Sequence, residues 1–280
     1  MRLGLGHSLA RRGFVAAAAD PAAAYIAAIT SAGATVTAPK QAAISTFISG
    51  EIAAGRWDSI KRLYLPIWES AAPNAICMKS LTSSTFIGGV THGAGYIQGN
   101  GTTGYANTNT TLASVNVTKD SYYAGYLRIE AGALSEYSFG VTESGLKALN
   151  VLDTYFFNEE TEQNYFAYAT ARVSNNALAH SDPPSTLFTI GGTTSSRFLK
   201  NRTSSGVTTR ATSSATNTQE LATAEFCLMT INSPTGVSSA RSNSKFGAFF
   251  FGTALTDAQD TAYTLALKTL WESTTGLTLP

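Results

Sequence analysis

The chain has 280 residues, of which 44% are hydrophobic and only 13% are charged, and its formal net charge is +1. This length suits one large domain with a small appendage or two modest domains, and the charged fraction is about half of the roughly 25% usual in soluble domains. The sequence has no long basic run, which excludes the electrostatic footprint of a nucleic-acid binder, and no apolar stretch approaches the ~20 residues needed for membrane insertion.

The first 19 residues form a Gly- and Ala-rich arm without a stable hydrophobic period. An arm of this kind becomes ordered only when something holds it down, so we expect it to contact the rest of the protein or neighbouring subunits. The low surface charge also favours oligomerisation, because it leaves contact surfaces uncharged. The candidates for assembly contacts in the arm are Arg2, Arg11, Arg12 and Phe14.

Residues 20–75 are predicted to form a helical anchoring segment. Asp20 is a favourable N-cap with Pro21 at the first helical position, and a second helix is predicted from Thr37 to a stop at Gly55. Apolar stripes on both helices predict a helical hairpin. A cluster of large apolar residues then follows, which we expect to join the hairpin to the next domain: Trp57, Ile60, Leu63, Tyr64 and Trp68.

From residue 76 to residue 280 the pattern changes to short strands separated by Gly, Asn and Ser. Residues 123–130 alternate in the period of a half-buried strand, whereas 226–231 and 246–251 are continuously apolar, which suits strands covered on both faces. This spacing predicts a mainly β domain, a sandwich or jelly roll. Thr256 and Gln259 fit the capping box of a C-terminal helix.

Three segments of this domain resemble laminin-G-like, concanavalin A-like domains. Residues 245–259, KFGAFFFGTALTDAQ, resemble the closing strand, turn and helix of that family. Residues 101–108, GTTGYANT, are similar to its early Gly-Tyr strand, and residues 196–202, SRFLKNR, to its strand-to-turn Asn segment. The resemblance spans roughly residues 76–272. It implies a concanavalin A-like antiparallel β-sandwich (jelly roll) with an N-terminal helical hairpin and a C-terminal helix.

The whole layout is similar to a group of proteins from tailed phages and prophages. In that group a helical piece with a W-x-x-I-x-x-L-Y motif precedes such a sandwich, and here the motif is WDSIKRLY at residues 57–64. The resemblance implies a structural or adhesive virion protein of the tail fibre, baseplate or head decoration, anchored by its N-terminal segment. It also implies that the partners are other virion proteins, that assembly takes place in the host cytoplasm and that the protein is exposed on the particle. These expectations rest on analogy with the layout of the phage proteins.

The sequence shows no convincing catalytic constellation, and we expect neither enzymatic activity nor a cofactor. Residues 99–104, GNGTTG, match a dinucleotide fingerprint in letters, but poor helix formers follow, so an Asn-Gly turn is predicted. Residues 6–10, GHSLA, resemble the nucleophile elbow of a hydrolase, but such an elbow follows a core strand, and only five residues precede Gly6. A zinc site is not expected, because the three histidines, His7, His92 and His180, are scattered along the sequence. The sequence also contains no loop typical of a calcium site.

Carbohydrate chemistry is the main alternative. Glycoside hydrolysis needs two carboxylates at a set separation. The densest acidic cluster is predicted to lie in a solvated loop, and it consists of Glu159, Glu160 and Glu162. A polysaccharide depolymerase therefore ranks last among the alternatives. Binding of host-surface polysaccharide without cleavage ranks higher. Sugar sites use exposed aromatic rings with polar neighbours, and the weak candidates for such rings are Tyr122, Tyr126 and Tyr155.

The chain has two cysteines, Cys77 and Cys227, which lie far apart in the sequence. A disulfide framework would need more cysteines at tighter spacing. We therefore expect two buried free thiols, with one long-range bridge as the alternative that the sequence leaves open.

Overall fold

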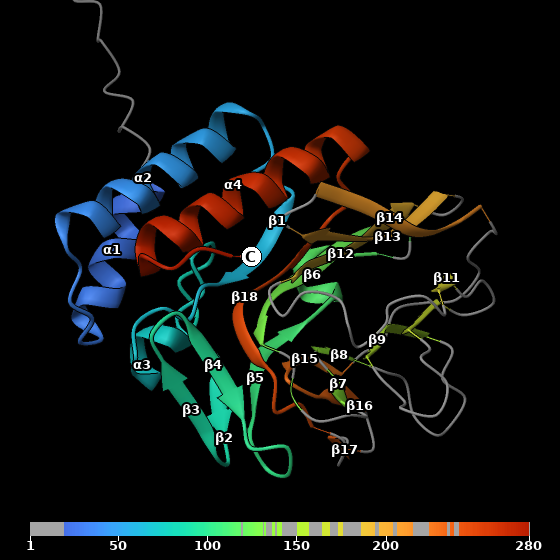
Figure 1. Ribbon diagram of the computed structural model, residues 1–280, viewed down its shortest axis with the longest axis horizontal. Helices are drawn as coiled ribbons and strands as arrows, with labels where there is room; N and C mark the ends of the chain where they lie inside the picture. Colours follow the sequence, from blue (N-terminus) through green and yellow to red (C-terminus); the bar gives the residue numbers. More distant parts are fainter. Residues whose placement is uncertain are drawn as a thin grey trace, which may run out of the picture.

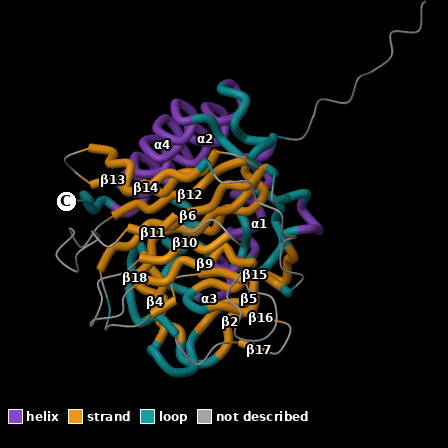
Figure 2. The backbone as a smooth tube through the Cα atoms, turned by 90° about the vertical axis from the view of Figure 1, so that its right-hand side faces the viewer, coloured by secondary structure: helices purple, strands orange, loops and turns teal. Residues whose placement is uncertain are grey.

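The computed structural model shows a mainly β protein with three sheets and a layer of helices (Figure 1). The helices lie along one side of the largest sheet, and the remaining strands lie on its other side (Figure 2). The residues that the structure describes are 20–118, 120–130, 132, 136–137, 139–141, 150–156, 164–168, 173–175, 186–193, 196–203, 206–214, 224–233, 236–237 and 241–279.

The main helices begin at the residues that the sequence predicts, and the second helix ends just before the predicted stop at Gly55. The Asp20 carboxylate accepts a hydrogen bond from the backbone N–H of Ala22 at 2.9 Å, and Thr256 and Gln259 form the predicted capping box. Gly276, with φ 72°, ends the last helix in the left-handed conformation. Within the described residues, none of the helices has the length and apolar character required to cross a membrane. The helices are α1 (Pro21–Ser31), α2 (Ala38–Ala53), α3 (Ala71–Ala75) and α4 (Asp257–Thr275).

The large sheet has eight antiparallel strands in the order β14-β13-β12-β6-β18-β4-β3, with β1 also paired to β18. The apolar run in β18 is buried along its length, which confirms the prediction of a strand covered on both faces. The strands are β1 (Ile60–Tyr64), β3 (Val90–Gly93), β4 (Tyr96–Gly99), β6 (Ser121–Glu130), β12 (Thr186–Thr193), β13 (Ser196–Thr203), β14 (Gly206–Ser213) and β18 (Lys245–Gly252).

The second sheet has six strands in the order β17-β16-β8-β15-β5-β2, and its β16–β8 pair is parallel. A third sheet of four strands has the order β11-β10-β9-β7. The strands of the second sheet are β2 (Thr85–Ile87), β5 (Tyr105–Thr111), β8 (Phe139–Val141), β15 (Glu225–Leu228), β16 (Ile231–Ser233) and β17 (Gly236–Val237). Those of the third are β7 (Glu136–Tyr137), β9 (Asn150–Phe156), β10 (Asn164–Tyr168) and β11 (Val173–Asn175).

The chain passes from the large sheet to the second sheet through residues 100–104, between β4 and β5. The Asn100 side-chain oxygen accepts hydrogen bonds from the backbone N–H groups of Thr102, Thr103 and Gly104 at 3.0, 2.8 and 2.8 Å. The segment is therefore an Asn-centred turn between two strands, which confirms the prediction that GNGTTG is a turn.

One hydrophobic core lies between the large sheet and the second sheet. From β6 it takes Tyr122, Ala124 and Tyr126, and from β15 it takes Phe226 and Leu228. The ring of Phe226 stacks on that of Phe251 of β18 with centroids 4.5 Å apart. Two sheets packed face to face on a shared core are a β-sandwich, as the sequence predicts.

A second hydrophobic core lies between the opposite face of the large sheet and the helices. The ring of Phe250 in β18 lies 5.5 Å from Tyr123 of β6 and 5.1 Å from Tyr263 of α4. Since Tyr122 and Tyr123 face the two different cores, β6 is buried on both sides. The prediction of a strand here was correct, but the prediction of half-burial was wrong, because the second sheet covers the face that alternation alone assigns to solvent, while the helices cover the other face.

The segment predicted as a helical anchor also contributes a strand. β1 lies within residues 20–75 and pairs with β18, with Leu63 opposite Phe250. Tyr25 of α1 and Phe47 of α2 belong to the same core as Trp271 of α4. The predicted limit between residues 75 and 76 therefore does not separate helices from strands, and the predicted arm of residues 1–19 lies outside the described residues.

Both cysteines are free and buried, which confirms the prediction of two free thiols. Cys227 is buried on β15, where burial and then the neighbouring Glu225 raise the pKa of its thiol to about 12. The group therefore remains a protonated thiol at neutral pH and is a poor nucleophile.

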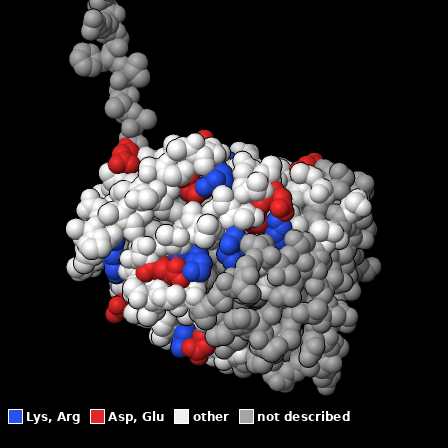
Figure 3. All heavy atoms as spheres, turned by 45° about the horizontal axis from the view of Figure 1, so that its top comes forward, with Lys and Arg blue, Asp and Glu red and all other residues white. Residues whose placement is uncertain are grey.

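The outer face of the helical layer carries few charges. Figure 3 shows a mostly uncharged surface on which acidic and basic side chains lie beside one another. Two of the pairs in the helical layer are Arg56, just after α2, with the buried Glu51, at 2.7 Å, and Lys268 with Glu272 on α4, at 2.6 Å. Their proximity means that each charge is largely neutralised locally.

Candidate functional site

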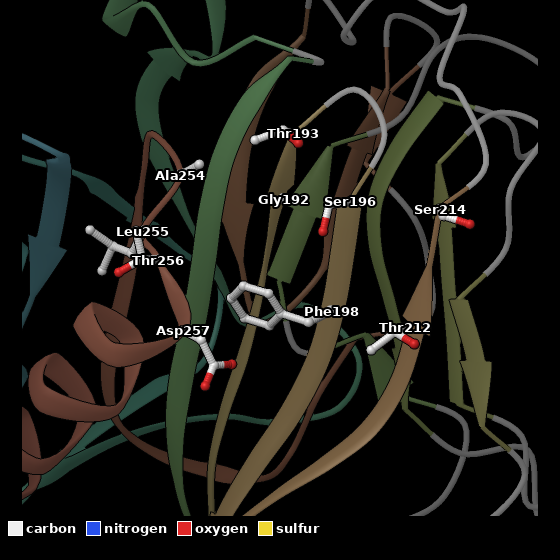
Figure 4. Close-up of a pocket in the computed structure, with 10 residues that line it drawn as sticks. All are labelled: Gly192, Thr193, Ser196, Phe198, Thr212, Ser214, Ala254, Leu255, Thr256 and Asp257. Atoms are coloured by element: carbon white, nitrogen blue, oxygen red, sulfur yellow. The ribbon is translucent and has the colours of Figure 1, made fainter.

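A pocket of about 650 Å³ opens where the β12–β13 hairpin and β14 meet the turn that leads into α4 (Figure 4). We call it the Phe198 pocket, because the ring of Phe198 lies among its other lining residues in Figure 4. It is lined by Gly192, Thr193, Ser196, Phe198, Thr212, Ser214, Ala254, Leu255, Thr256 and Asp257.

Strand register explains the position of the Phe198 ring. Phe198 lies opposite Gly191 of β12 and Thr212 of β14, so the three residues form one row across the sheet. A Cβ atom at Gly191 would lie 2.7 Å from Cζ of Phe198 and 3.0 Å from Cδ2 of Tyr123. Glycine at this position thus leaves the room in which the Phe198 ring lies, half-buried, at the pocket wall.

A buried ion-pair network lies under the pocket and joins β13 to α4. The Lys200 ammonium, whose side chain is 3% exposed, contacts the carboxylates of Asp257 and Asp260, the latter at 3.2 Å. Asp260 is 1% exposed and also accepts a hydrogen bond from the Tyr123 hydroxyl at 2.8 Å. The Lys200 Nζ lies 4.4 Å from the centroid of the Phe198 ring, so the network also supports this ring.

The tyrosine in this network is held in its neutral form. Burial, and then the adjacent Asp260 carboxylate, raise the pKa of Tyr123 well above its ordinary value. Tyr123 therefore keeps the proton that it donates to Asp260. The Asp260 carboxylate has both Lys200 and Tyr123 as partners, which is how a buried charge is accommodated in a protein interior.

Asp257 is the part of the network that reaches the pocket. Its side chain is 83% exposed, whereas Asp260 one turn later in α4 is buried. Among the lining residues that the structure describes, Asp257 supplies the one carboxylate. Hydroxyl groups come from the strand residues Thr193, Ser196 and Thr212 and from the loop residues Ser214 and Thr256. An apolar ring edged by hydroxyls and a carboxylate offers both a stacking surface and hydrogen-bonding groups to a polyol.

The aromatic residues proposed from the sequence do not form this site. Tyr122 and Tyr126 are 0% exposed, and Tyr126 stacks on Phe188 inside the sandwich with ring centroids 5.0 Å apart. The prediction that these two rings bind glycans was wrong, because the inner face of β6 meets the second sheet. Tyr155 is on β9, and its side chain lies outside the described residues.

The other sequence candidates for functional residues lie elsewhere or are not described. Outside the described residues are the arm residues Arg2, Arg11, Arg12 and Phe14, the acidic cluster Glu159, Glu160 and Glu162, and His7 and His180. Across the part of the chain that the structure describes, no group of three His, Cys, Asp or Glu side chains could hold a metal ion.

His92 has a structural environment. Its Nδ1 lies 3.1 Å from the side-chain nitrogen of Asn74, and its ring packs edge-on against Phe86 with centroids 4.5 Å apart. Burial lowers the pKa of His92 below its ordinary value, which favours a neutral imidazole that accepts from Asn74. These contacts join α3 to the β3–β4 hairpin.

A second groove, of about 520 Å³, runs between α2 and α4. Its walls are mostly small residues, and its charged end is a closed pair in which Arg56 donates two hydrogen bonds to the Glu51 carboxylate, both at 2.7 Å. Since Glu51 is 1% exposed, this end offers no carboxylate to a ligand.

Comparison with known proteins gives fold similarity alone. No protein-family model matches the chain, and no curated protein matches it. A Trypanosoma rangeli sialidase complex is 9% identical with a TM-score of 0.46, over 73% of this chain and 32% of the sialidase. The Ca²⁺- and mannose-bound VIP36 exoplasmic/lumenal domain is 9% identical with a TM-score of 0.41, over 70% and 91% of the two chains. An arabinofuranosidase complex is 10% identical with a TM-score of 0.37, over 69% and 41%.

All three of these neighbours have TM-scores below 0.5, so the β-sandwich assignment rests on the sheets and the shared core of this protein itself. The chain spans about a third of the length of the sialidase, 32%. At such low identity no site residue is carried over from them, and the site is argued from its own geometry.

Proposed function

We propose that this protein is a non-catalytic interaction module that binds carbohydrate in the Phe198 pocket. The observation that carries the proposal is the half-buried Phe198 ring edged by hydroxyls and by the exposed Asp257 carboxylate. The apolar face of a sugar ring stacks on an aromatic side chain, while its hydroxyls exchange hydrogen bonds with polar groups at the rim.

Preorganisation of the pocket supports this function. Gly191 leaves space for the Phe198 ring, and Lys200 packs against it from within the protein. A ring that is already held in place loses little conformational freedom when a ligand binds, so more of the contact energy remains as affinity.

The arrangement of carboxylates favours binding without cleavage. Canonical glycoside hydrolysis uses two carboxylates on either side of the scissile bond. Here Asp257 reaches the pocket, while Asp260 is buried between Lys200 and Tyr123. A ligand in the pocket would therefore meet a hydrogen-bond acceptor and no acid–base pair from these two residues.

Replacing Phe198 by alanine is expected to weaken saccharide binding by about 1–1.5 kcal/mol, or roughly fivefold to tenfold, through the loss of ring stacking. A glycan array with the full chain would identify a ligand, and titration calorimetry would compare the variants. Tyr96→Ala is the matched control, because Tyr96 is a half-buried aromatic residue on β4, at the other side of the same sheet. Equal affinity of Phe198→Ala and the unaltered protein would exclude this pocket.

The particle-surface role is a finer proposal. The similarity of residues 57–64 and of the helix-then-sandwich layout to tailed-phage proteins supports a virion location, with host-surface polysaccharide as the ligand and the N-terminal segment as the anchor. An antibody raised against the purified protein is expected to decorate purified phage particles in electron micrographs. Unlabelled particles would remove the virion location and leave the carbohydrate proposal standing.

A further inference from the structure

The charges at the Phe198 pocket are unequally exposed. Asp257 and Asp260 share a single ammonium, that of Lys200. The positive end of the α4 dipole, equivalent to about half a charge, offsets part of the excess, but both carboxylates lie in the first turn of this helix. Lys200 by itself therefore does not balance both carboxylates.

The accessible charge is that of Asp257. The Lys200 side chain is 3% exposed, so a ligand in the pocket cannot reach its ammonium without displacing the residues around it. Asp257, in contrast, presents an 83% exposed carboxylate on the pocket side of the pair. One partner of the ion pair is thus hidden and the other is open to a ligand.

The next cation along β13, Arg202, acts on the buried carboxylate: burial lowers the pKa of Arg202, and the nearby Asp260 carboxylate raises it. Arg202 donates from Nε to the Thr264 hydroxyl at 3.0 Å and from a terminal nitrogen to the Thr261 carbonyl at 2.9 Å. These contacts place its guanidinium on α4, one turn beyond Asp257, and Arg202 does not line the pocket.

We infer that the Phe198 pocket selects saccharides that carry a protonated amine over saccharides that carry a carboxylate. An ammonium group on the sugar would pair with the open side of the Asp257 carboxylate while the sugar ring stacks on Phe198. A uronic or other acidic sugar would bring a like charge to the same carboxylate, which lowers its affinity. The inference rests on the proposed carbohydrate binding and names the chemical class of the ligand.

The test compares three tetrasaccharides of the same length by titration calorimetry at pH 5.5 and low salt: a glucosamine tetramer, its fully N-acetylated counterpart and a galacturonic acid tetramer. We expect the amine form to bind about twofold to fivefold more tightly than the N-acetylated form, as for an exposed ion pair, and the acidic form to bind most weakly. At 0.5 M salt the difference is expected to shrink, since exposed charges are screened.

Asp257→Asn is expected to abolish the preference for the amine while keeping the binding of the N-acetylated tetramer. Glu130→Gln is the matched control, because Glu130 is also an exposed carboxylate paired with a lysine, Lys245, and lies at the far end of β6. It should keep the preference. Equal affinities for the three tetramers, or a preference that survives in Asp257→Asn, would overturn the charge selection and leave carbohydrate binding intact. Failure of every saccharide to bind would overturn both.

Discussion

Replacing Lys200 by methionine is expected to lower the free energy of unfolding by about 3–5 kcal/mol, the cost of leaving a buried charge without its partner. Lys200 contacts both Asp257 and Asp260, and the latter has 1% exposure. After the substitution, the Asp260 carboxylate keeps the Tyr123 hydroxyl and the attraction of Arg202, but it loses the ammonium in direct contact with it. The loss should therefore be far larger than that of a surface ion pair.

Chemical denaturation followed by circular dichroism would measure this loss. Lys268→Met is the control on the same helix, because Lys268 pairs with Glu272 at the surface and its removal should cost at most about 0.5 kcal/mol. The double variant Lys200→Met with Asp260→Asn should recover part of the stability, since no buried charge then remains. Similar midpoints for Lys200→Met and Lys268→Met would show that the buried network does not form.

Alanine at either Phe249 or Phe250 is expected to cost about 3–5 kcal/mol, because each ring is fully buried. The two neighbours point to opposite faces of β18. Phe249 packs against Phe246 inside the sandwich, with centroids 4.9 Å apart, and Phe250 packs against Tyr263 of α4. A strand with one solvated face would show a large cost at only one of the two positions.

The same denaturation measurement tests whether the helices are an integral layer of the protein. Leu265→Ala on α4 is the control, because Leu265 is 53% exposed and its truncation should change stability by no more than about 0.5 kcal/mol. If Phe250→Ala were as mild as Leu265→Ala while Phe249→Ala remained costly, the packing of the helices on the sheet would be wrong.

The sequence was most informative where the cause of a structure is local. Caps depend on side chains within a few residues of the helix end, so Asp20 and the Thr256–Gln259 box were predictable. The long apolar run in β18 also predicted burial on both faces correctly. The alternation of apolar and polar residues in β6 led to a wrong prediction of half-burial. Such a pattern shows that a strand has two different faces, but it does not show what covers each face.

The pocket was not predictable from the sequence. Residues 196–202 were recognised as a strand and Asp257 as part of a capping box, but neither pattern indicates that they meet. Lys200 and Asp257 are 57 residues apart in the sequence. The pairing of β13 with β12 and β14 forms the row of residues that contains Phe198, and this row lies beside the start of α4. An aromatic position opposite a glycine, as in Phe198 and Gly191, was the available signal that a ring lies flat on the sheet.

The joining of the first and last elements of the chain has a consequence for synthesis. β1 pairs with β18, and α1, α2 and α4 share one core, so this part of the core is completed only after the partners in residues 245–275 have been made. At roughly 5–20 residues per second, the ribosome needs on the order of ten to forty seconds to reach these partners after β1 has emerged. During that interval the apolar stripes of the nascent helices stay uncovered, which makes them natural targets for chaperones that act on growing chains.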